Sequence, residues 1–183
     1  MSNYSFKSPI ITIFGGTGFL GRYIVNRLAK FGYIINVVTR FPNEAIFLKT
    51  SGNVGQINFV KGSFSNLSKI TYLLSSSEIV INCVGILNEE KNNKFKQIHS
   101  DAPEKLAILA KDIGVKKFIH ISSIGADQKS DSDYAKSKGI GETKILNAFP
   151  DAIILRPSIV FGSEDQFFNL FSQISCISPI LPI

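Results

Sequence analysis

The sequence predicts an α/β fold built on a doubly wound parallel sheet. Short apolar, β-rich runs alternate with helical patterns along the whole chain. These runs are apolar at nearly every position, which is typical of strands buried on both faces of a parallel sheet. The motifs described below each follow such a run, and ligands of open parallel sheets bind beyond the carboxyl ends of the strands.

The first expected strand is Ile10–Phe14, which stops at Gly15-Gly16. Apolar residues then recur at helical spacing over residues 18–31, and Gly32 ends the helix. The remaining strands are expected at Tyr33–Thr39, Ile57–Val60, Ile79–Val84, Phe118–Ser122 and Ala152–Leu155. Helices are expected between them at Ser65–Leu74, Lys96–Ile113 and Tyr134–Ala148.

The length of 183 residues suits one domain, expected over residues 1–183. Within it, residues 157–183 are expected to begin an incomplete region that closes over a substrate. Ser172–Ile183 is apolar, punctuated by proline and without a polar capping segment, as in a truncated chain. The polar stretch Asp127–Asp133 is expected to be a mobile loop over the site.

Composition excludes several classes of function. The net charge is +6, but the basic residues are scattered and the phenylalanines lie mostly in apolar stretches, which disfavours nucleic-acid binding. Cys83 and Cys176 lack disulfide or metal-site spacing, so no metal is expected. We interpret His99 and His120 as structural and Cys83 as a core residue. Without an export signal or a membrane-length apolar run, a cytoplasmic protein with no transmembrane segment is expected.

A glycine-rich loop follows the first expected strand. Gly15-Gly16-Thr17-Gly18-Phe19-Leu20-Gly21 has GxxGxxG spacing and opens a helix. Gly15 would allow a tight turn, Gly18 a close approach of the backbone to a pyrophosphate, and Gly21 close packing of helix on strand. A glycine-rich turn without a ligand is the alternative. Strand, spacing and helix together favour a dinucleotide site, with the phosphates at the helix N-terminus, and hence the Rossmann NAD(P)-binding fold.

The end of the second strand indicates which dinucleotide is bound. An NAD-preferring site carries an acidic residue there, but this strand ends in Thr39-Arg40 and the next acid is Glu44. An arginine can form two hydrogen bonds with a 2′-phosphate. We therefore expect NADP(H) to be preferred over NAD(H). The alternative is that Arg40 is an ordinary solvated surface residue.

Tyr134 and Lys138 stand four residues apart in a helical stretch and so share one face. The ammonium of Lys138 would help Tyr134 to exchange a proton with a carbonyl or an alcohol, and could hold the nicotinamide ribose. Ser122 or Ser123, at the end of the preceding strand, could orient the substrate oxygen. These four residues are the candidate catalytic set. The alternative is a solvated Tyr/Lys pair on a helix surface.

Together the motifs resemble the atypical short-chain dehydrogenases around the nucleotide-binding accessory subunit of respiratory complex I (NADH:ubiquinone oxidoreductase), including bacterial relatives. The resemblance spans most of the chain. The most specific segment is RPSIVFG running into EDQFFN. The segments that carry the resemblance are ITIFGGTGFLGRYIV (Ile11–Val25), INCVGIL (Ile81–Leu87), KKFIHISSIGAD (Lys116–Asp127), YAKSKGIGE (Tyr134–Glu142) and ILRPSIVFGSEDQFFNLF (Ile154–Phe171).

The resemblance implies a set of cofactor-binding residues. The set comprises Gly15, Thr17, Gly18, Phe19 and Leu20 at the pyrophosphate, Arg40 at the 2′-phosphate, Ser63 at the adenine, Val84 and Gly85 at the ribose, Tyr134 and Lys138 on the cofactor side, and Pro157 and Ser158 near the nicotinamide. Ser63 stands where relatives usually carry an aspartate that binds the adenine amino group, so we expect weaker adenine binding.

The resemblance also implies a role for the protein. Similar proteins are thought to hold NADP(H) as a structural or regulatory ligand, so we expect association with complex I subunits and little or no turnover. A peripheral location at the inner membrane face is then the alternative to a free cytoplasmic one. A second possibility is an active NADP-dependent reductase or epimerase that uses the Ser-Tyr-Lys set. A third is a sensor of the NADP(H)/NADP+ ratio, although such sensors usually need no YxxxK.

Overall fold

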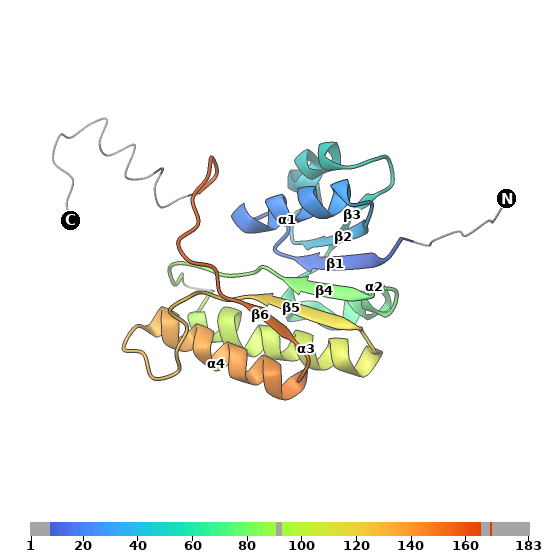
Figure 1. Cartoon of the computed structure of the whole chain (residues 1–183). Coiled ribbons are helices and arrows are strands. Elements are labelled where there is room, and N and C mark those ends of the chain that lie inside the picture. Colours follow the sequence, from blue (N-terminus) through green and yellow to red (C-terminus); the bar gives the residue numbers. More distant parts are fainter. Residues whose placement is uncertain (1–7, 91–92, 166–168, 170–183) are drawn as a thin grey trace, which may run out of the picture.

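Six parallel strands form one sheet in the order β3-β2-β1-β4-β5-β6 (Figure 1). The computed structural model describes residues 8–90, 93–165 and 169. The strands are β1 (Ile10–Phe14), β2 (Ile34–Thr39), β3 (Ile57–Lys61), β4 (Ile79–Asn82), β5 (Lys117–Ile121) and β6 (Ile153–Leu155). The predicted doubly wound parallel sheet is confirmed. Its order reverses between β1 and β4, which is where such sheets bind their ligands.

The strands are connected mainly by helices. Their bounds are α1 (Phe19–Lys30), α2 (Thr71–Ser75), α3 (Ala102–Ile113) and α4 (Asp133–Ala148). Three further segments are η1 (Pro42–Ser51) and η2 (Phe64–Ile70), which are 3₁₀-helical, and η3 (Lys96–Asp101), which is π-helical. The long helix expected at Lys96–Ile113 therefore starts with a wider turn, and η1 was not predicted from the sequence. Ala45 and Leu48, the buried residues of η1, are three apart, which is the repeat of a 3₁₀-helix.

The sheet has an apolar core on each face. Neighbouring residues of a strand point to opposite faces, and Ile13 and Phe14 accordingly belong to different cores. Ile13 packs with Val25 of α1, whereas Phe14 belongs to the core that includes Leu106 of α3 and Ile145 of α4. Within the described residues, no helix is long and apolar enough to cross a membrane.

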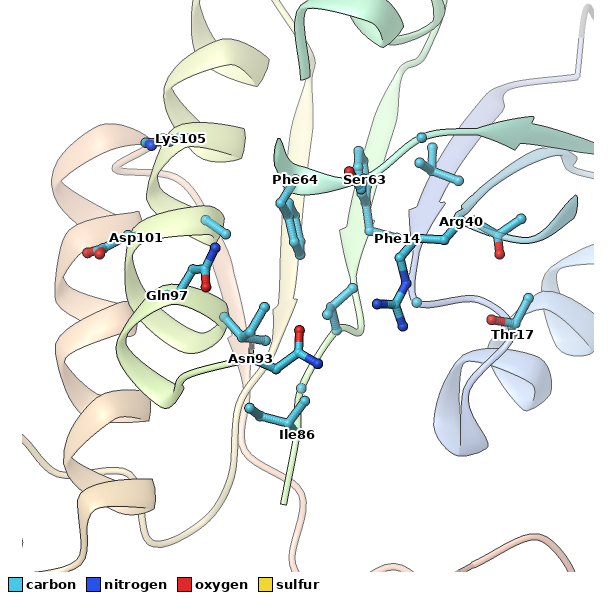
Figure 2. A pocket seen from close by; sticks show the side chains of 18 residues that line it. Phe14, Thr17, Arg40, Ser63, Phe64, Ile86, Asn93, Gln97, Asp101 and Lys105 are labelled. Atoms are coloured by element: carbon cyan, nitrogen blue, oxygen red, sulfur yellow. The ribbon is translucent and has the colours of Figure 1, made fainter. Parts of the chain in front are cut away.

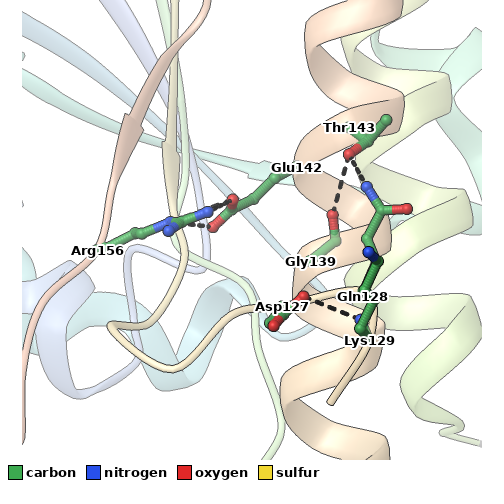
Figure 3. Close-up of polar contacts among 7 residues, drawn as sticks. All are labelled: Asp127, Gln128, Lys129, Gly139, Glu142, Thr143 and Arg156. Carbon is green, nitrogen blue, oxygen red and sulfur yellow. Dashed lines mark hydrogen bonds and ion pairs between the residues drawn. The ribbon is translucent and has the colours of Figure 1, made fainter.

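The loop before α4 is held against that helix, as Figure 3 shows, although its polarity suggested a mobile segment. The Asp127 amide donates to the Ala135 carbonyl at 3.2 Å, and the Gln128 side chain donates to Thr143. A side chain at Gly139 would collide with this loop, because its Cβ would lie 2.5 Å from the Asp127 carbonyl carbon. The absence of a side chain at position 139 thus lets the loop pack directly on α4.

Most of residues 157–183, expected to begin a closing region, lie outside the described residues. The described part runs from β6 to Asp165 and contacts both halves of the fold. At its start, Arg156 forms an ion pair with the buried carboxylate of Glu142 on α4 (Figure 3). At its far end, Glu164 accepts a hydrogen bond from the Tyr23 hydroxyl of α1 at 2.5 Å. This segment therefore connects α4 with α1.

Candidate functional site

The turn between β1 and α1 brings backbone against backbone. Gly15 has φ +75°, in the left-handed region, and its carbonyl accepts from the Gly18 amide at 3.1 Å. A Cβ at Gly21 would lie 2.0 Å from the Gly15 carbonyl oxygen, and one at Gly15 would lie 2.9 Å from the Val84 nitrogen. Neither position has room for a side chain, so the N-terminus of α1 and the residues after β4 can approach the turn closely.

A cavity of about 690 Å³ opens beside this turn, beyond the carboxyl ends of β1 to β4. Its volume lies within the roughly 300–1,000 Å³ typical of small-molecule sites. Six residues of the expected cofactor set line it: Gly15, Thr17, Arg40, Ser63, Val84 and Gly85. Figure 2 shows the Arg40 side chain extending into the cavity from β2. The structure thus places the glycine turn at the same cavity as Arg40, the residue expected to bind the 2′-phosphate.

The opposite wall was not foreseen from the sequence. It consists of side chains from η2, from the segment before η3, and from η3 and α3, including Phe64, Asn93, Gln97, Asp101 and Lys105 (Figure 2). The Phe64 ring stacks on Phe14, with centroids 5.4 Å apart and planes inclined by 6°. The sequence predicted only helices here, at Ser65–Leu74 and Lys96–Ile113, and a helical pattern does not show what a helix faces.

The residues present fit a dinucleotide. The glycines of the turn leave its backbone open to a pyrophosphate. Helix α1 has no acidic residue in its first turn, so the positive potential of its N-terminus is retained. Arg40 adds a cation on the β2 side, and the aromatic pair Phe14 and Phe64 offers an apolar surface. Gly18, Phe19 and Leu20 belong to the same turn and first helical residues, but they are not among the residues that line the cavity.

Lys138 is buried next to the cavity, with 4% of its surface exposed. Its ammonium donates to the Ile121 carbonyl at 3.3 Å and lies 5.9 Å from the centroid of the Tyr134 ring. A Cβ at Gly85 would be 3.3 Å from the Lys138 nitrogen, so the ammonium reaches the loop that lines the cavity. Burial lowers the pKa of Lys138 to about 8, against the opposing effect of the Glu142 carboxylate. The expected Tyr-Lys pair is therefore close together, and its ammonium lies next to the cavity loop Val84–Ile86, although neither Tyr134 nor Lys138 is among the residues that line the cavity.

The expected serines lie at the end of β5. The hydroxyl oxygens of Ser122 and Ser123 are buried and have no hydrogen-bond partner within the described part of the chain. Buried hydroxyls without a partner are rare in proteins. Neither serine is among the residues that line the cavity. The Pro157 carbonyl accepts from the Ile124 amide at 3.0 Å, which places Pro157 beside this strand end, whereas Ser158 is exposed. Neither Pro157 nor Ser158 lines the cavity.

The two histidines are buried, in keeping with a structural role. Burial, assisted by the nearby Lys138 ammonium, lowers the pKa of His99 to about 4 and that of His120 to about 3. Burial also raises the pKa of the Cys83 thiol to about 12, so this thiol stays protonated at neutral pH. The described residues contain no cluster of three or more His, Cys, Asp or Glu side chains that could hold a metal ion.

The lowered pKa of Lys138 predicts a stability effect. Lys138→Met should raise the free energy of unfolding at pH 7 by up to about 3 kcal/mol, because a buried ammonium is replaced by an apolar group. The difference in unfolding free energy between the variant and the wild type should shrink between pH 8 and pH 10.5. In that range Lys138 of the unfolded wild type keeps a proton that the folded wild type has lost, so the wild type becomes more stable as the pH rises. Denaturant unfolding of both proteins from pH 7 to 10 measures this. The exposed Lys136→Met is the control, and a pH-independent difference would contradict the prediction.

Comparison with known proteins supports the resemblance seen in the motifs. Residues 11–172 match the NAD dependent epimerase/dehydratase family. Over 170 residues the chain is 37% identical to the mouse (Mus musculus) protein named NADH dehydrogenase [ubiquinone] 1 alpha subcomplex subunit 9, mitochondrial, covering 92% of this chain and 45% of that protein. It is 31% identical over 175 residues to a ceramide reductase of Caulobacter vibrioides, covering 95% and 53% of the two chains. The chain thus spans about half the length of these relatives.

A solved structure shows the same fold. UDP-glucuronic acid 4-epimerase from Bacillus cereus, determined in complex with NAD, superimposes with a TM-score of 0.71 at 22% identity, over 91% of this chain and 63% of that one. The similarity to the mitochondrial complex I subunit confirms the resemblance inferred from the motifs. The family match, covering most of the sequence, is consistent with the sheet order and the glycine turn. The chain therefore belongs to the NAD dependent epimerase/dehydratase family.

Proposed function

We propose that this chain binds NADP(H) in the cavity beside the glycine turn and serves as a structural or assembly element of respiratory complex I, with little or no turnover. The observation that carries the choice of dinucleotide is Arg40, whose side chain extends into the cavity from the end of β2. A 2′-phosphate is doubly charged near neutral pH and pairs well with a guanidinium. An NAD-preferring site would carry an acid at the end of β2. Here the acidic residue that lines the cavity is Asp101 of η3, on the wall opposite Arg40.

The proposed association with complex I has two supports. One is the similarity to mitochondrial proteins named as NADH dehydrogenase subunits. The other is the exposed apolar surface around β6, an edge strand of the sheet. Ile153 and Leu155 are 43% and 47% exposed, and Phe161 beyond them is 77% exposed. Exposed apolar side chains on one face of an edge strand, as at Ile153 and Leu155, are typical of surfaces that a protein partner covers.

The preference for NADP(H) can be measured by titration. NADPH should bind at least about tenfold more tightly than NADH, since a charge-assisted hydrogen bond contributes roughly 1.5–3 kcal/mol. Arg40→Ala should remove that preference while leaving NADH affinity nearly unchanged. Arg27→Ala, which removes an arginine from the last turn of α1, is the matched control. Equal wild-type affinities for the two dinucleotides, or an Arg40→Ala variant that still prefers NADPH, would refute the assignment.

Association with complex I can be tested on the affinity-tagged chain in its native membranes. After solubilisation in a mild detergent, the wild type should co-purify with NADH:ubiquinone oxidoreductase subunits. Leu155→Glu should lose them but keep NADPH binding, because it places a charge on the β6 surface outside the cavity. Ile46→Glu, at an exposed apolar residue of η1, is the control and should still co-purify. Absence of these subunits from the wild-type preparation would contradict the proposed association.

A reductase is the second candidate, favoured by the unpartnered buried hydroxyls of Ser122 and Ser123. They follow Ile121, whose carbonyl accepts from the Lys138 ammonium at 3.3 Å. When bound, NADPH would supply a hydride to a carbonyl carbon. The Tyr134 hydroxyl would give the carbonyl oxygen its proton, and one of the serines would donate a hydrogen bond to that oxygen. The Lys138 ammonium would stabilise the negative charge left on Tyr134.

This candidate predicts a specific effect of Tyr134→Phe. The variant should lose at least about 99% of any carbonyl-dependent NADPH oxidation, since general acid catalysis contributes roughly 100-fold or more. Its NADPH affinity should stay within a factor of about two, because the ring and its packing remain. Oxidation followed by absorbance and affinity measured by fluorescence give the two readings. Wild-type activity with an unaffected variant would exclude Tyr134 as the acid.

A further inference from the structure

His99 connects two parts of the site that are far apart in the sequence. Its ring is fully buried between the loop after β4 and helix α4. The Ile86 amide of that loop donates to Nε2 at 3.0 Å, and Nδ1 lies 2.9 Å from the Ser137 hydroxyl of α4. Both ring nitrogens are therefore used, one toward each element.

The direction of these hydrogen bonds fixes the protonation of the ring. Because Nε2 accepts from the Ile86 amide, the proton of the neutral imidazole must be on Nδ1, where it is donated to Ser137. The Ser137 hydroxyl in turn donates to the Tyr134 carbonyl at 2.7 Å. The lowered pKa of His99 keeps the ring neutral in the physiological range. A continuous chain of hydrogen bonds thus runs from the cavity loop to the turn of α4 that carries Tyr134.

Packing holds the ring in this orientation. It stacks on Phe95, with centroids 5.3 Å apart, and meets the Tyr134 ring edge-on at the same distance. Helix α4 approaches the His99 backbone closely because Gly141 has no side chain, and a Cβ there would lie 1.9 Å from the His99 carbonyl oxygen. The His99 backbone is thus packed tightly on α4, and its ring is held by Phe95 and Tyr134.

The loop held by His99 also contacts Lys138. Gly85 lies next to Ile86 and lines the cavity, and a Cβ there would be 3.3 Å from the Lys138 nitrogen and 3.7 Å from His99 Nε2. On the other side of Gly85, the Val84 amide donates to the Asn82 side chain at 3.1 Å. Side chains thus anchor the backbone on both sides of Gly85, which lines the cavity and lies next to the Lys138 nitrogen.

We propose that His99 is a positioning residue that sets the spacing between the cavity loop Val84–Ile86 and the turn of α4 that bears Tyr134 and Lys138. It orders the nicotinamide-ribose end of the site, whereas the adenosine end, formed by the ends of β2 and β3, does not depend on it. The inference rests on the proposed binding of NADP(H).

The test compares two ligands on the same protein. His99→Phe keeps a ring for stacking but leaves the Ile86 amide and the Ser137 hydroxyl without their partner. We expect its dissociation constant for NADPH to rise about tenfold or more, as for loss of a buried hydrogen bond pair. Adenosine 2′,5′-bisphosphate, which lacks the nicotinamide ribose, should bind within about twofold of the wild-type affinity. Equal weakening of both ligands, or of neither, would overturn the proposal.

Two further variants separate positioning from general destabilisation. His99→Gln can still accept from Ile86 and should recover part of the NADPH affinity. Thr12→Val removes the buried Thr12–Ser77 hydrogen bond of 2.6 Å, which joins β1 to the residues before β4. It should lower the melting temperature and leave the ratio of the two dissociation constants unchanged. A Thr12→Val variant that changes this ratio as His99→Phe does would show that the effect is merely structural.

A ligand-free measurement tests the same arrangement. Long-range ¹H–¹⁵N correlation spectra of the wild-type imidazoles should show His99 as the Nδ1–H tautomer and still neutral at pH 5.5. An Nε2–H tautomer would overturn the proposal even if NADPH binds. If the wild type binds neither NADPH nor the bisphosphate, the proposed function fails as well, whereas normal wild-type binding with an unaffected His99→Phe variant refutes only the role of His99.

Discussion

The close contact between the Gly15 carbonyl and Gly21 is the constraint on which the rest of the site depends. Because neither residue has a side chain, α1 begins directly against the end of β1, and the residues after β4 approach the same turn. This turn lies where the strand order reverses, so the N-terminus of α1 faces the crevice between the two halves of the sheet. The place of the α1 N-terminus at the cavity, with its positive potential, and the exposed backbone of the turn both follow from this contact.

The buried charge of Lys138 lowers the stability of the folded chain. A buried ammonium at Lys138 is unfavourable by itself, and its lowered pKa records that penalty. Glu142, one helical turn further on, partly compensates it and also binds Arg156. The two buried histidines beside Lys138 stay neutral, which avoids a cluster of like charges. Perturbed groups gathered in one place are typical of functional sites, and Lys138 and His99 both lie next to Gly85, which lines the cavity.

The local patterns predicted the elements that have a strong hydrophobic period. The strands appear where apolar runs were found, with ends that differ by at most two residues. Segment η1 was missed because its buried residues repeat every three positions and give no amphipathic α-helical pattern. The loop Asp127–Asp133 was expected to be mobile because it is polar, but its polar groups bond to one another and to α4. Polarity alone does not reveal whether the partner is water or protein.

By itself, the sequence determined three features: the glycine turn, the cation after β2, and the pair Tyr134 and Lys138. Each of them depends on residues that are close together in the chain or on a position within one βα unit. Only the tertiary structure decided what stands opposite them. Asn93, Gln97 and Lys105 line the far wall of the cavity, and His99 joins Ile86 to Ser137, because the fold brings separate segments together. A periodic pattern shows that a helix buries one face, but the hydrogen-bond partners of a buried side chain are set by which elements pack against it.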